Sequence, residues 1–564
     1  FKNTGLTSVT LPASLEMLGN STFANCASLK EATFTGNITS FGSSVFSSTA
    51  LEKVVLSDKM ETLGSSTFNN LKTLKIVTYD SYTVKDATRF NDGYENALPP
   101  SLTSLPSSLF SGCTSLKSMD LSNVKTVAGS LFKGCSALES VVLSTDLEVL
   151  GDYMFQNCTS LSSIEIPSSV TSLGKYAFDG CTKLTSIDLP ETLTFMGTYT
   201  FRKTGLTSIV IPSGVKSFGT SATECAASSN VYLFAECKSL TTVVLPANIN
   251  DFKIGGYVFN NCTKLTTIKV GADGEENVLD GVTLVAQYAF SGCGITELSL
   301  PDVTEVGKYS FSKGDLQSIS LPALTKHAEY VFSDSKKLTS VTLNDELESL
   351  AKYMFNGCTA LEQITLPSSL VFLNTYTFKG SGLKEIVIPE GVKHIGSSQN
   401  GAANVSTPIN TFENCASLVK VTLPAGLETI GREVFKNCSN LTIVTYTGGA
   451  EYALPASTRL VGNYAFQGCK SLTALEMKGV ETLGINVFDG CSSLTSVDLS
   501  SLSTMGENVF EDCGKLLSVV LNKYLSVISE EAFLNCTSLE AIELPEALTT
   551  ISANAFKNSG LTSV

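Results

Sequence analysis

The sequence has no tryptophan, only two histidines and no uninterrupted apolar run long enough to cross a bilayer. A membrane-spanning helix needs about 20 predominantly apolar residues, so this absence argues against one in the segment. Basic residues are also in the minority. The sequence has 38 Lys and Arg and 53 Asp and Glu, which gives a net charge of −15. Nucleic acids and anionic membranes attract clustered Lys and Arg. We therefore expect neither as a partner.

Sequence signatures of catalysis are missing as well. His327 and His394 lie in no arrangement typical of a Ser/His/Asp-like site, and the sequence has no phosphate-binding glycine loop and no zinc-ligand spacing. The acidic run at residues 273–276 lacks the ligand pattern of a calcium-binding EF-hand. We expect no enzymatic activity, no metal and no cofactor.

The sequence does contain one repeat motif, which recurs every 22 or 23 residues over most of its 564 residues. One copy runs through Phe178, Cys181, Leu184, Ile187, Leu189, Pro190, Leu193, Met196 and Gly197. We count 23 phenylalanines at the equivalent landmark position, from Phe1 to Phe556. A repeat of this length is one coil of a solenoid. The predicted fold is therefore a repeat solenoid of about 22 coils, forming one continuous domain over residues 1–564.

Each coil has a predictable layout. Its Leu-x-x-Ile-x-Leu stretch is rich in β-branched residues and predicts a short strand, which ends at Pro190 or its equivalent because proline cannot donate a hydrogen bond. A glycine turn follows, as at Gly197, and then a short helical or 3₁₀ turn should carry the phenylalanine inward. Parallel strands stack ~4.8 Å apart. We therefore expect Phe155, Phe178 and Phe201 to form a core ladder.

These phrases also carry a family resemblance. Leu-x-x-Ile-x-Leu-Pro followed by Ala-Phe-x-x-Cys resembles the BspA-like leucine-rich repeat family (LRR_5-type), and Ser-Leu-Gly-Lys-Tyr-Ala-Phe-Asp-Gly-Cys at residues 172–181 is a close match. The resemblance covers nearly the whole chain and implies a right-handed, curved solenoid with its strands on the concave side. It also implies a secreted or surface-attached protein, since several members are adhesins for host matrix glycoproteins or for other cells. The fold is a scaffold, so the partner depends on the surface residues.

Insertions add a second, longer period. They lie near residues 77–103, 220–231, 271–283, 397–409 and 446–457. Similar insertions recur after seven coils, which we interpret as tandem modules starting near residues 110, 290 and 466. Insertions in solenoids form loops on one edge; their regularity suits a fibre or sheath, and duplication of neutral loops is the alternative. The chain begins and ends within a copy of the repeat motif and has no polar capping coils. We therefore expect it to be a fragment of a longer chain.

The cysteines follow the same repeat. Fifteen of the 16 lie three residues after a landmark phenylalanine, as Cys158 and Cys181 do. Neighbouring coils would bring them within bridging distance, but Thr204 and Ser335 replace the cysteine in other coils. We therefore predict a ladder of small, buried, unreactive thiols and no disulfides. Cys225, which lies in an insertion, is expected to be a free loop thiol, with an exposed reactive thiol as the alternative.

Two kinds of surface feature remain. Eight Asn-x-Ser/Thr sequons occur, about as many as the composition gives by chance, and the candidate glycosylation sites are Asn404, Asn37 and Asn20. The solvent-facing strand positions have no aromatic residue and no arginine, which are common anchors of protein recognition. They do contain a mild acidic stripe, which suits a basic partner or a cation, at Asp120, Glu165 and Asp188.

Aromatic residues gather around two insertions instead. A candidate docking edge is formed by Tyr79, Tyr82 and Tyr94 in one insertion and by Tyr446 and Tyr452 in its later counterpart. The alternative is that these tyrosines pack each insertion onto its own coil.

Together these patterns predict a non-catalytic structural or adhesive protein at the cell surface or outside the cell. It would contact protein or glycoprotein partners, or assemble with itself, through many weak contacts along the stack. One alternative is a subunit of an extracellular fibre or sheath that assembles through the periodic insertions. The other is an intracellular scaffold in a reducing compartment, which unpaired thiols would suit.

Overall fold

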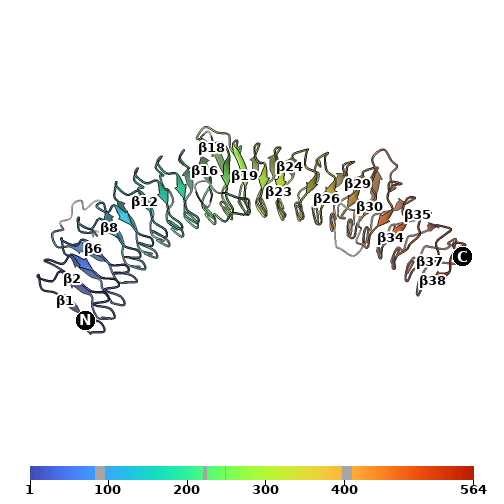
Figure 1. Cartoon of the computed structure of the whole chain (residues 1–564). Coiled ribbons are helices and arrows are strands. Elements are labelled where there is room, and N and C mark those ends of the chain that lie inside the picture. The colour runs from blue at the N-terminus through green and yellow to red at the C-terminus, as the bar shows by residue number, and fades with distance from the viewer. Residues whose placement is uncertain (83–95, 220, 222–224, 248, 397–409) are drawn as a thin grey trace. The chain divides into compact units, whose positions relative to one another are not determined.

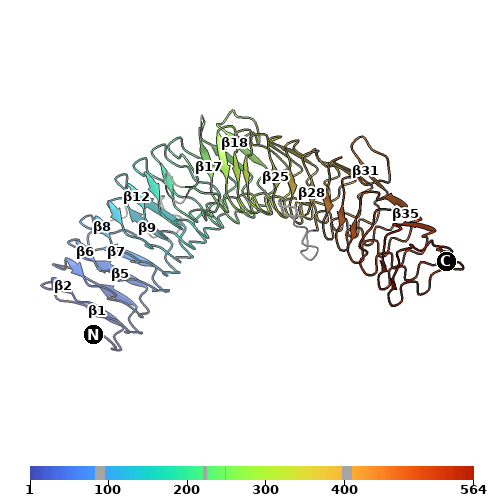
Figure 2. The same cartoon turned by 45° about the vertical axis from the view of Figure 1, so that its right-hand side comes forward.

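The structure, a computed structural model, describes residues 1–82, 96–219, 221, 225–247, 249–396 and 410–564. Its contacts divide these residues into two compact units, residues 1–295 and 296–564. Each unit is a stack of coils whose short strands lie side by side, as Figure 1 and Figure 2 show. The strand pairs within each unit are parallel, and the described residues contain no helix. The predicted repeat solenoid is confirmed.

Most coils have a longer strand of three or four residues, which comes from the Leu-x-x-Ile-x-Leu stretch. In the first unit these strands are β1 (Ser8–Thr10), β3 (Glu31–Thr33), β5 (Lys53–Leu56), β7 (Ile76–Tyr79), β9 (Ser118–Leu121), β11 (Ser140–Leu143), β15 (Ser208–Val210), β16 (Thr242–Leu245) and β18 (Thr267–Val270). In the second unit they are β20 (Glu297–Ser299), β22 (Ser318–Leu321), β24 (Ser340–Leu343), β27 (Glu385–Val387), β29 (Lys420–Leu423), β31 (Ile443–Tyr446), β33 (Ala474–Glu476), β35 (Ser496–Leu499) and β36 (Ser518–Leu521).

A second and mostly two-residue strand follows in most coils, where the sequence predicted only an apolar edge. In the first unit these are β2 (Met17–Leu18), β4 (Ser40–Phe41), β6 (Thr62–Leu63), β8 (Ser104–Leu105), β10 (Thr126–Val127), β12 (Val149–Leu150), β13 (Ser172–Leu173), β14 (Phe195–Met196), β17 (Phe252–Ile254) and β19 (Val282–Val285). In the second unit they are β21 (Glu305–Val306), β23 (Lys326–His327), β25 (Ser349–Leu350), β26 (Phe372–Leu373), β28 (His394–Ile395), β30 (Thr429–Ile430), β32 (Leu460–Val461), β34 (Thr482–Leu483), β37 (Val527–Ile528) and β38 (Thr550–Ile551).

Strand register puts like residues of successive coils on top of one another. Val54 of β5 pairs with Ala32 of β3 on one side and with Val77 of β7 on the other. All three are buried, whereas the residues that alternate with them along each strand are more exposed. One coil therefore has no closed interior of its own, and its apolar residues are buried by the coils next to it.

The turn before each landmark phenylalanine was expected to be helical or 3₁₀, and this expectation is wrong. Tyr176 and Gly180, on either side of Phe178, have φ values of 57° and 78°, which lie outside the right-handed helical region. Their N–H groups donate along the stack, to the carbonyl oxygens of Thr198 at 2.9 Å and Arg202 at 2.8 Å. A helix cannot continue here because these N–H groups bond to the next coil.

The landmark phenylalanines stack in the core. Phe155, Phe178 and Phe201 have no exposed surface. Their ring centroids lie 5.4 Å and 5.6 Å apart, with planes 12° and 2° from parallel. Stacked aromatic pairs contribute about 0.5–1.5 kcal/mol beyond the burial of their surface, so the ladder joins each coil to its neighbours.

Beside this ladder, none of the 16 cysteines, all of which lie in the described residues, forms a disulfide, and 15 of them are buried. The thiol of Cys181 donates to the carbonyl oxygen of Phe155 in the preceding coil, with 3.1 Å between sulfur and oxygen. Ser335 takes the same position in its own coil and donates to the carbonyl of Phe311 at 2.7 Å. Most coils thus have at this position a small side chain that can donate a hydrogen bond, namely Cys, Ser or Thr, whereas Leu71 and Gly314 are exceptions.

Burial also controls how these thiols ionise. Desolvation raises the pKa of Cys135 to about 12 and that of Cys237 to about 11, so both thiols stay protonated at neutral pH. Cys225 is half-buried, and burial raises the pKa of its thiol as well. The thiolate is the reactive form of cysteine, and the predicted column of unreactive thiols is therefore consistent with the structure.

The longer-strand column is interrupted at residues 161–167 and 184–190 of the first unit and at residues 361–367 of the second. At the turns, in contrast, the rings of Tyr176 and Tyr199 lie only 4.4 Å apart. The resemblance implied strands on the concave side, and that position stays a prediction.

Candidate functional site

The outer surface of the longer strands is repetitive and weakly polar. Val210 of β15 and Val387 of β27 are 63% and 62% exposed. The carboxylate of Asp120 in the predicted acidic stripe accepts the N–H of Ser122 at 2.8 Å. Among the described residues, no group of three or more His, Cys, Asp or Glu could hold a metal ion. A partner for the stripe therefore stays a prediction.

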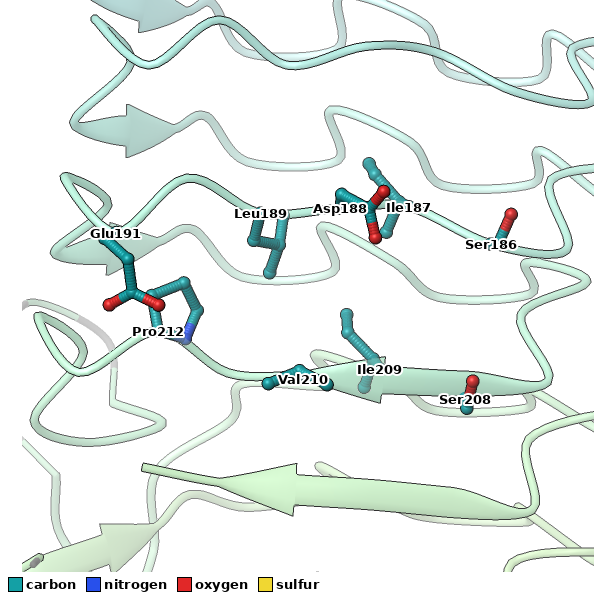
Figure 3. A pocket seen from close by; sticks show the side chains of 9 residues that line it. All are labelled: Ser186, Ile187, Asp188, Leu189, Glu191, Ser208, Ile209, Val210 and Pro212. Carbon is teal, nitrogen blue, oxygen red and sulfur yellow. The ribbon is translucent and has the colours of Figure 1, made fainter. Parts of the chain in front are cut away.

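A shallow pocket opens between two coils of this surface, where the strand column is interrupted (Figure 3). Its lining consists of Ser186, Ile187, Asp188, Leu189, Glu191, Ser208, Ile209, Val210 and Pro212. Glu191 accepts hydrogen bonds from the hydroxyl and N–H of Ser213, at 3.0 Å and 3.3 Å. The pocket lining contains no histidine, thiol or amine side chain.

The first part of the predicted docking edge packs inward. Tyr79 is 8% exposed, and its ring meets that of Tyr82 edge-on, with centroids 5.0 Å apart. Tyr94 lies outside the described residues. Tyr79 and Tyr82 thus pack against each other beside β7.

The later counterpart has a similar arrangement. Tyr446 and Tyr452 are half-buried. The ring of Tyr446 covers Gly449 so closely that a side chain there would clash with it. The carbonyl of Tyr452 accepts the N–H of Glu476 in β33 at 2.7 Å. These contacts join the insertion to its own and the next coil, and a docking role for this edge stays a prediction.

The structure reveals instead a column of stacked tyrosines along the turns, two residues before each landmark phenylalanine. In the first unit successive ring centroids lie 4.1–4.8 Å apart, with planes within 12° of parallel, along Tyr153, Tyr176, Tyr199, Tyr232, Tyr257 and Tyr288. In the second unit the centroids lie 4.3–4.6 Å apart along Tyr309, Tyr330, Tyr353 and Tyr376. We call these ten residues the tyrosine ladder. All ten are half-buried.

Sequence reasoning missed this ladder although its signal is present. Tyrosine recurs two residues before the phenylalanine, as in Tyr176-Ala177-Phe178. Only the observed register shows that residues 21 to 33 positions apart, such as Tyr309 and Tyr330 or Tyr199 and Tyr232, touch face to face.

Each ladder tyrosine has an unusual backbone conformation. The φ values of Tyr176 and Tyr199 are 57° and 63°. Bulky residues rarely adopt this left-handed region, which costs about 1–3 kcal/mol for a residue other than glycine. Ser130 and Asn486 occupy the same position in other coils, with φ of 65° and 52°. The left-handed conformation therefore belongs to the turn of the coil, whichever residue occupies it. The ladder is the candidate functional site because its aromatic rings stack in register along the surface.

Charged side chains line the ladder. In the first unit the guanidinium of Arg202 donates from Nε and Nη2 to the carboxylate of Asp179, at 2.8 Å and 3.1 Å. Gln156 donates to the same carboxylate at 2.9 Å. The guanidinium carbon lies 4.9 Å from the ring centroid of Tyr199. This distance permits a cation–π interaction, which joins the ion pair to the aromatic column.

A second cluster lies where the ladder of the second unit gives way to other residues. Asn410 and Glu433 take the tyrosine position and are only 3% and 8% exposed. The amide of Asn410 donates to Glu433 at 2.5 Å and to Glu413 at 2.7 Å. Lys379 lies 2.7 Å from Glu413, and Arg432 lies 3.3 Å from Glu433. The buried carboxylates are therefore paired with cations.

The phenol groups themselves stay neutral. Burial raises the pKa of Tyr176 and of Tyr330, and the neighbouring phenols Tyr199 and Tyr353 raise it further, because two phenolates side by side would repel each other. At physiological pH the ladder is a strip of ring edges and uncharged hydroxyl groups. Such a strip can donate and accept hydrogen bonds while burying apolar surface.

The two histidines are not part of the tyrosine ladder. His327 bonds through Nε2 to the carbonyl of Ser349 at 2.9 Å, and His394 bonds through Nδ1 to the hydroxyl of Thr429 at 3.0 Å. These contacts join each histidine to the next coil.

The candidate glycosylation residues Asn20 and Asn37 are exposed. Their side-chain oxygens accept hydrogen bonds from the N–H of Ser43 and from Lys59. Asn404 lies outside the described residues. In the part of the chain that is described, no helix is both long enough and apolar enough to span a bilayer.

Comparison with known proteins gives a family match and structural relatives. The family described as BspA type leucine rich repeat region matches in six copies, over residues 1–90, 103–228, 227–276, 283–401, 405–452 and 459–564. No curated protein matches the sequence at a significant level.

Among solved structures, a leucine-rich repeat protein from Bacteroides ovatus is 21% identical, with a TM-score of 0.34, over 82% of this chain and 92% of that one. A leucine rich cell surface protein from Faecalibacterium prausnitzii is 18% identical, with a TM-score of 0.32, over 74% and 88%. The pneumococcal vaccine antigen PcpA is 17% identical, with a TM-score of 0.34, over 70% and 87%.

Proposed function

The chain belongs to the BspA type leucine rich repeat family, and on that premise we propose that it is a non-catalytic protein of the cell surface or the extracellular space. It contacts protein or glycoprotein partners through many repeated weak contacts. The tyrosine ladder is the observation that supports this proposal most. Tyrosine and arginine are enriched among the residues that dominate binding energy at protein interfaces. Here tyrosines lie in register along successive coils, and Arg202 lies beside Tyr199.

Repetition supplies the affinity in this proposal. When one coil engages a partner, the next identical position lies one coil away and binds at a high effective concentration. Such contacts need no deep pocket, which agrees with the shallow recess between the coils at Asp188 and Val210.

The free cysteines are compatible with either compartment. An intracellular scaffold would keep its thiols reduced, but burial has the same effect outside the cell. Cys181, for example, is buried and donates to the carbonyl of Phe155. The state of the thiols therefore does not favour the intracellular alternative.

The binding test uses substitutions that the coil already tolerates. Tyr176, Tyr199 and Tyr232 are changed together to Asn, the residue that occupies this position as Asn486 and Asn508. In the matched control, an equal number of exposed strand residues, including Val210, are changed to Thr. We expect retention on intact cells or on immobilised matrix glycoproteins to fall at least about tenfold for the ladder variant and to stay unchanged for the control. Equal retention of both variants would contradict a binding role for the ladder.

Location is tested separately. A membrane-impermeant reagent added to intact cells of the source should label the protein, and a fully protected protein would refute a surface position.

A further inference from the structure

We propose that the tyrosine ladder is a site of oxidative cross-linking, in which a one-electron oxidant of the haem peroxidase type, using hydrogen peroxide, joins tyrosines of successive coils as dityrosine. The inference goes beyond the proposed binding function and does not depend on it.

Geometry is the first argument. A tyrosyl radical becomes dityrosine when it meets a second tyrosyl radical, and in most proteins this requires diffusion. Here the ring of Tyr232 has Tyr199 at 4.5 Å on one face and Tyr257 at 4.1 Å on the other. Strand register keeps the three rings in place, so each radical already has its partner in contact. Holding two reactants together in this way gives a large kinetic advantage over a bimolecular encounter.

The shortage of competing groups is the second argument. The sequence has no tryptophan. Fifteen of the 16 cysteines are buried, and of the eight methionines only Met17, at 64% exposure, is accessible. The ladder tyrosines are half-buried and so remain accessible to an oxidant at their outer edges. Oxidising equivalents that reach this protein are therefore directed to tyrosine.

The hydroxyl group is the third argument. The phenylalanine ladder of the same coils shows that stacking needs no hydroxyl, since Phe155, Phe178 and Phe201 stack with parallel rings. In the tyrosine ladder the hydroxyl is retained in ten residues despite the left-handed backbone. The hydroxyl is what allows a ring to lose an electron and a proton together.

The reaction balances as follows. Each of two phenols loses one electron and its hydroxyl proton, and hydrogen peroxide takes up both electrons and both protons to leave as two molecules of water. The two phenoxyl radicals join through a new bond between ring carbons ortho to oxygen. The hydrogen on each of these carbons then moves to the oxygen and restores both hydroxyl groups. The product is two hydrogens lighter and carries a covalent link between neighbouring coils.

Such a covalent cross-link would stabilise the stack. It closes a loop of one coil and restricts the unfolded chain, in the way a disulfide of equal loop length does. A stack that is held at its turns could then resist separation of its coils.

The experiment uses the whole chain at low concentration with a haem peroxidase and limiting hydrogen peroxide, followed by digestion and mass spectrometry. We expect peptide pairs lighter by two hydrogens that join ladder neighbours such as Tyr176 and Tyr199 within one chain. Tyr464 is the internal control, because it lies in the same column but has Glu433 and Asn486 in the adjacent coils. Tyr524, which is 71% exposed and outside the column, controls for simple accessibility.

A variant tests whether adjacency is the cause. Changing Tyr176, Tyr232 and Tyr288 to Phe keeps every ring of the first unit but leaves no two tyrosines adjacent within it. Dityrosine within residues 153–288 should fall at least tenfold, while circular dichroism shows an unchanged fold. Links found only between chains, links at Tyr464 or Tyr524 equal to those in the ladder, or undiminished coupling in the variant would each overturn the proposal. Because no binding partner is involved, its failure is distinct from failure of the proposed function.

Discussion

Arg202 and Asp179 lie in successive coils and form a two-pronged ion pair, with Nε–Oδ1 and Nη2–Oδ2 distances of 2.8 Å and 3.1 Å. The Asp179 side chain is only 4% exposed, and that of Arg202 is 26% exposed. The pair thus neutralises a carboxylate that water barely reaches, beside the ring of Tyr199.

Removing the arginine should therefore be costly. We expect Arg202→Ala to lower the free energy of unfolding by about 3–5 kcal/mol, because it leaves a buried carboxylate without its cation. The measurement is urea unfolding followed by circular dichroism. Lys203→Ala is the matched control, since its ion pair with Glu236 is 3.6 Å long and exposed and should be worth less than about 1 kcal/mol. Equal losses in both variants would show that the pair is not buried as described.

A second prediction concerns the phenylalanine ladder. Phe178→Ala should open a cavity between Phe155 and Phe201 and cost about 3–5 kcal/mol. Limited proteolysis should then cut the neighbouring coils first. Val210→Ala, at a 63% exposed position, should stay within about 0.5 kcal/mol of wild type. If Phe178→Ala resists protease as well as Val210→Ala does, the stacked core is misassigned.

The thiol column makes a third prediction. Cys181→Ser keeps a donor for the carbonyl of Phe155, as Ser335 does for Phe311. Cys181→Val has a similar volume but removes the donor, so we expect it to be less stable than the serine variant by about 0.5–1.5 kcal/mol. Thermal unfolding of the two variants side by side measures the difference, and a more stable valine variant would argue against the hydrogen bond.

A fourth prediction is loss of stability in alkali. Burial raises the pKa of Cys237 to about 11 and that of Cys135 to about 12, whereas a thiol in the unfolded chain titrates near about 8.5. Between these values the unfolded chain has lost protons that the folded chain keeps. The stabilisation is therefore complete below the unfolded pKa and is lost as the pH rises through the folded values.

We expect the urea midpoint to decline steadily from about pH 8.5 to about pH 11. The ladder tyrosines, whose pKa values are also raised by burial, act in the same direction at higher pH. Replacing Cys135 and Cys237 by Ser should reduce the slope, and a midpoint independent of pH would contradict their burial.

The repeat motif predicted the coil and the inward position of Phe178, because its apolar positions recur once in each coil. The replacement of cysteine by Thr204 and Ser335 in other coils predicted the unpaired state of Cys181. The motif did not predict the second strand, such as β13, because two residues are too few to show a periodic pattern. It also predicted helical turns where Tyr176 has a positive φ. That conformation depends on a hydrogen bond to the next coil, which a single coil does not contain.

The sequence by itself thus determined the stack and its core, because the same positions of the repeat motif are buried in every coil of a solenoid. Only the tertiary structure decided which surface side chains meet, since the contact between Tyr176 and Tyr199 depends on how closely the turns of successive coils approach. That spacing is set by hydrogen bonds between coils, and it cannot be predicted from the sequence of one coil.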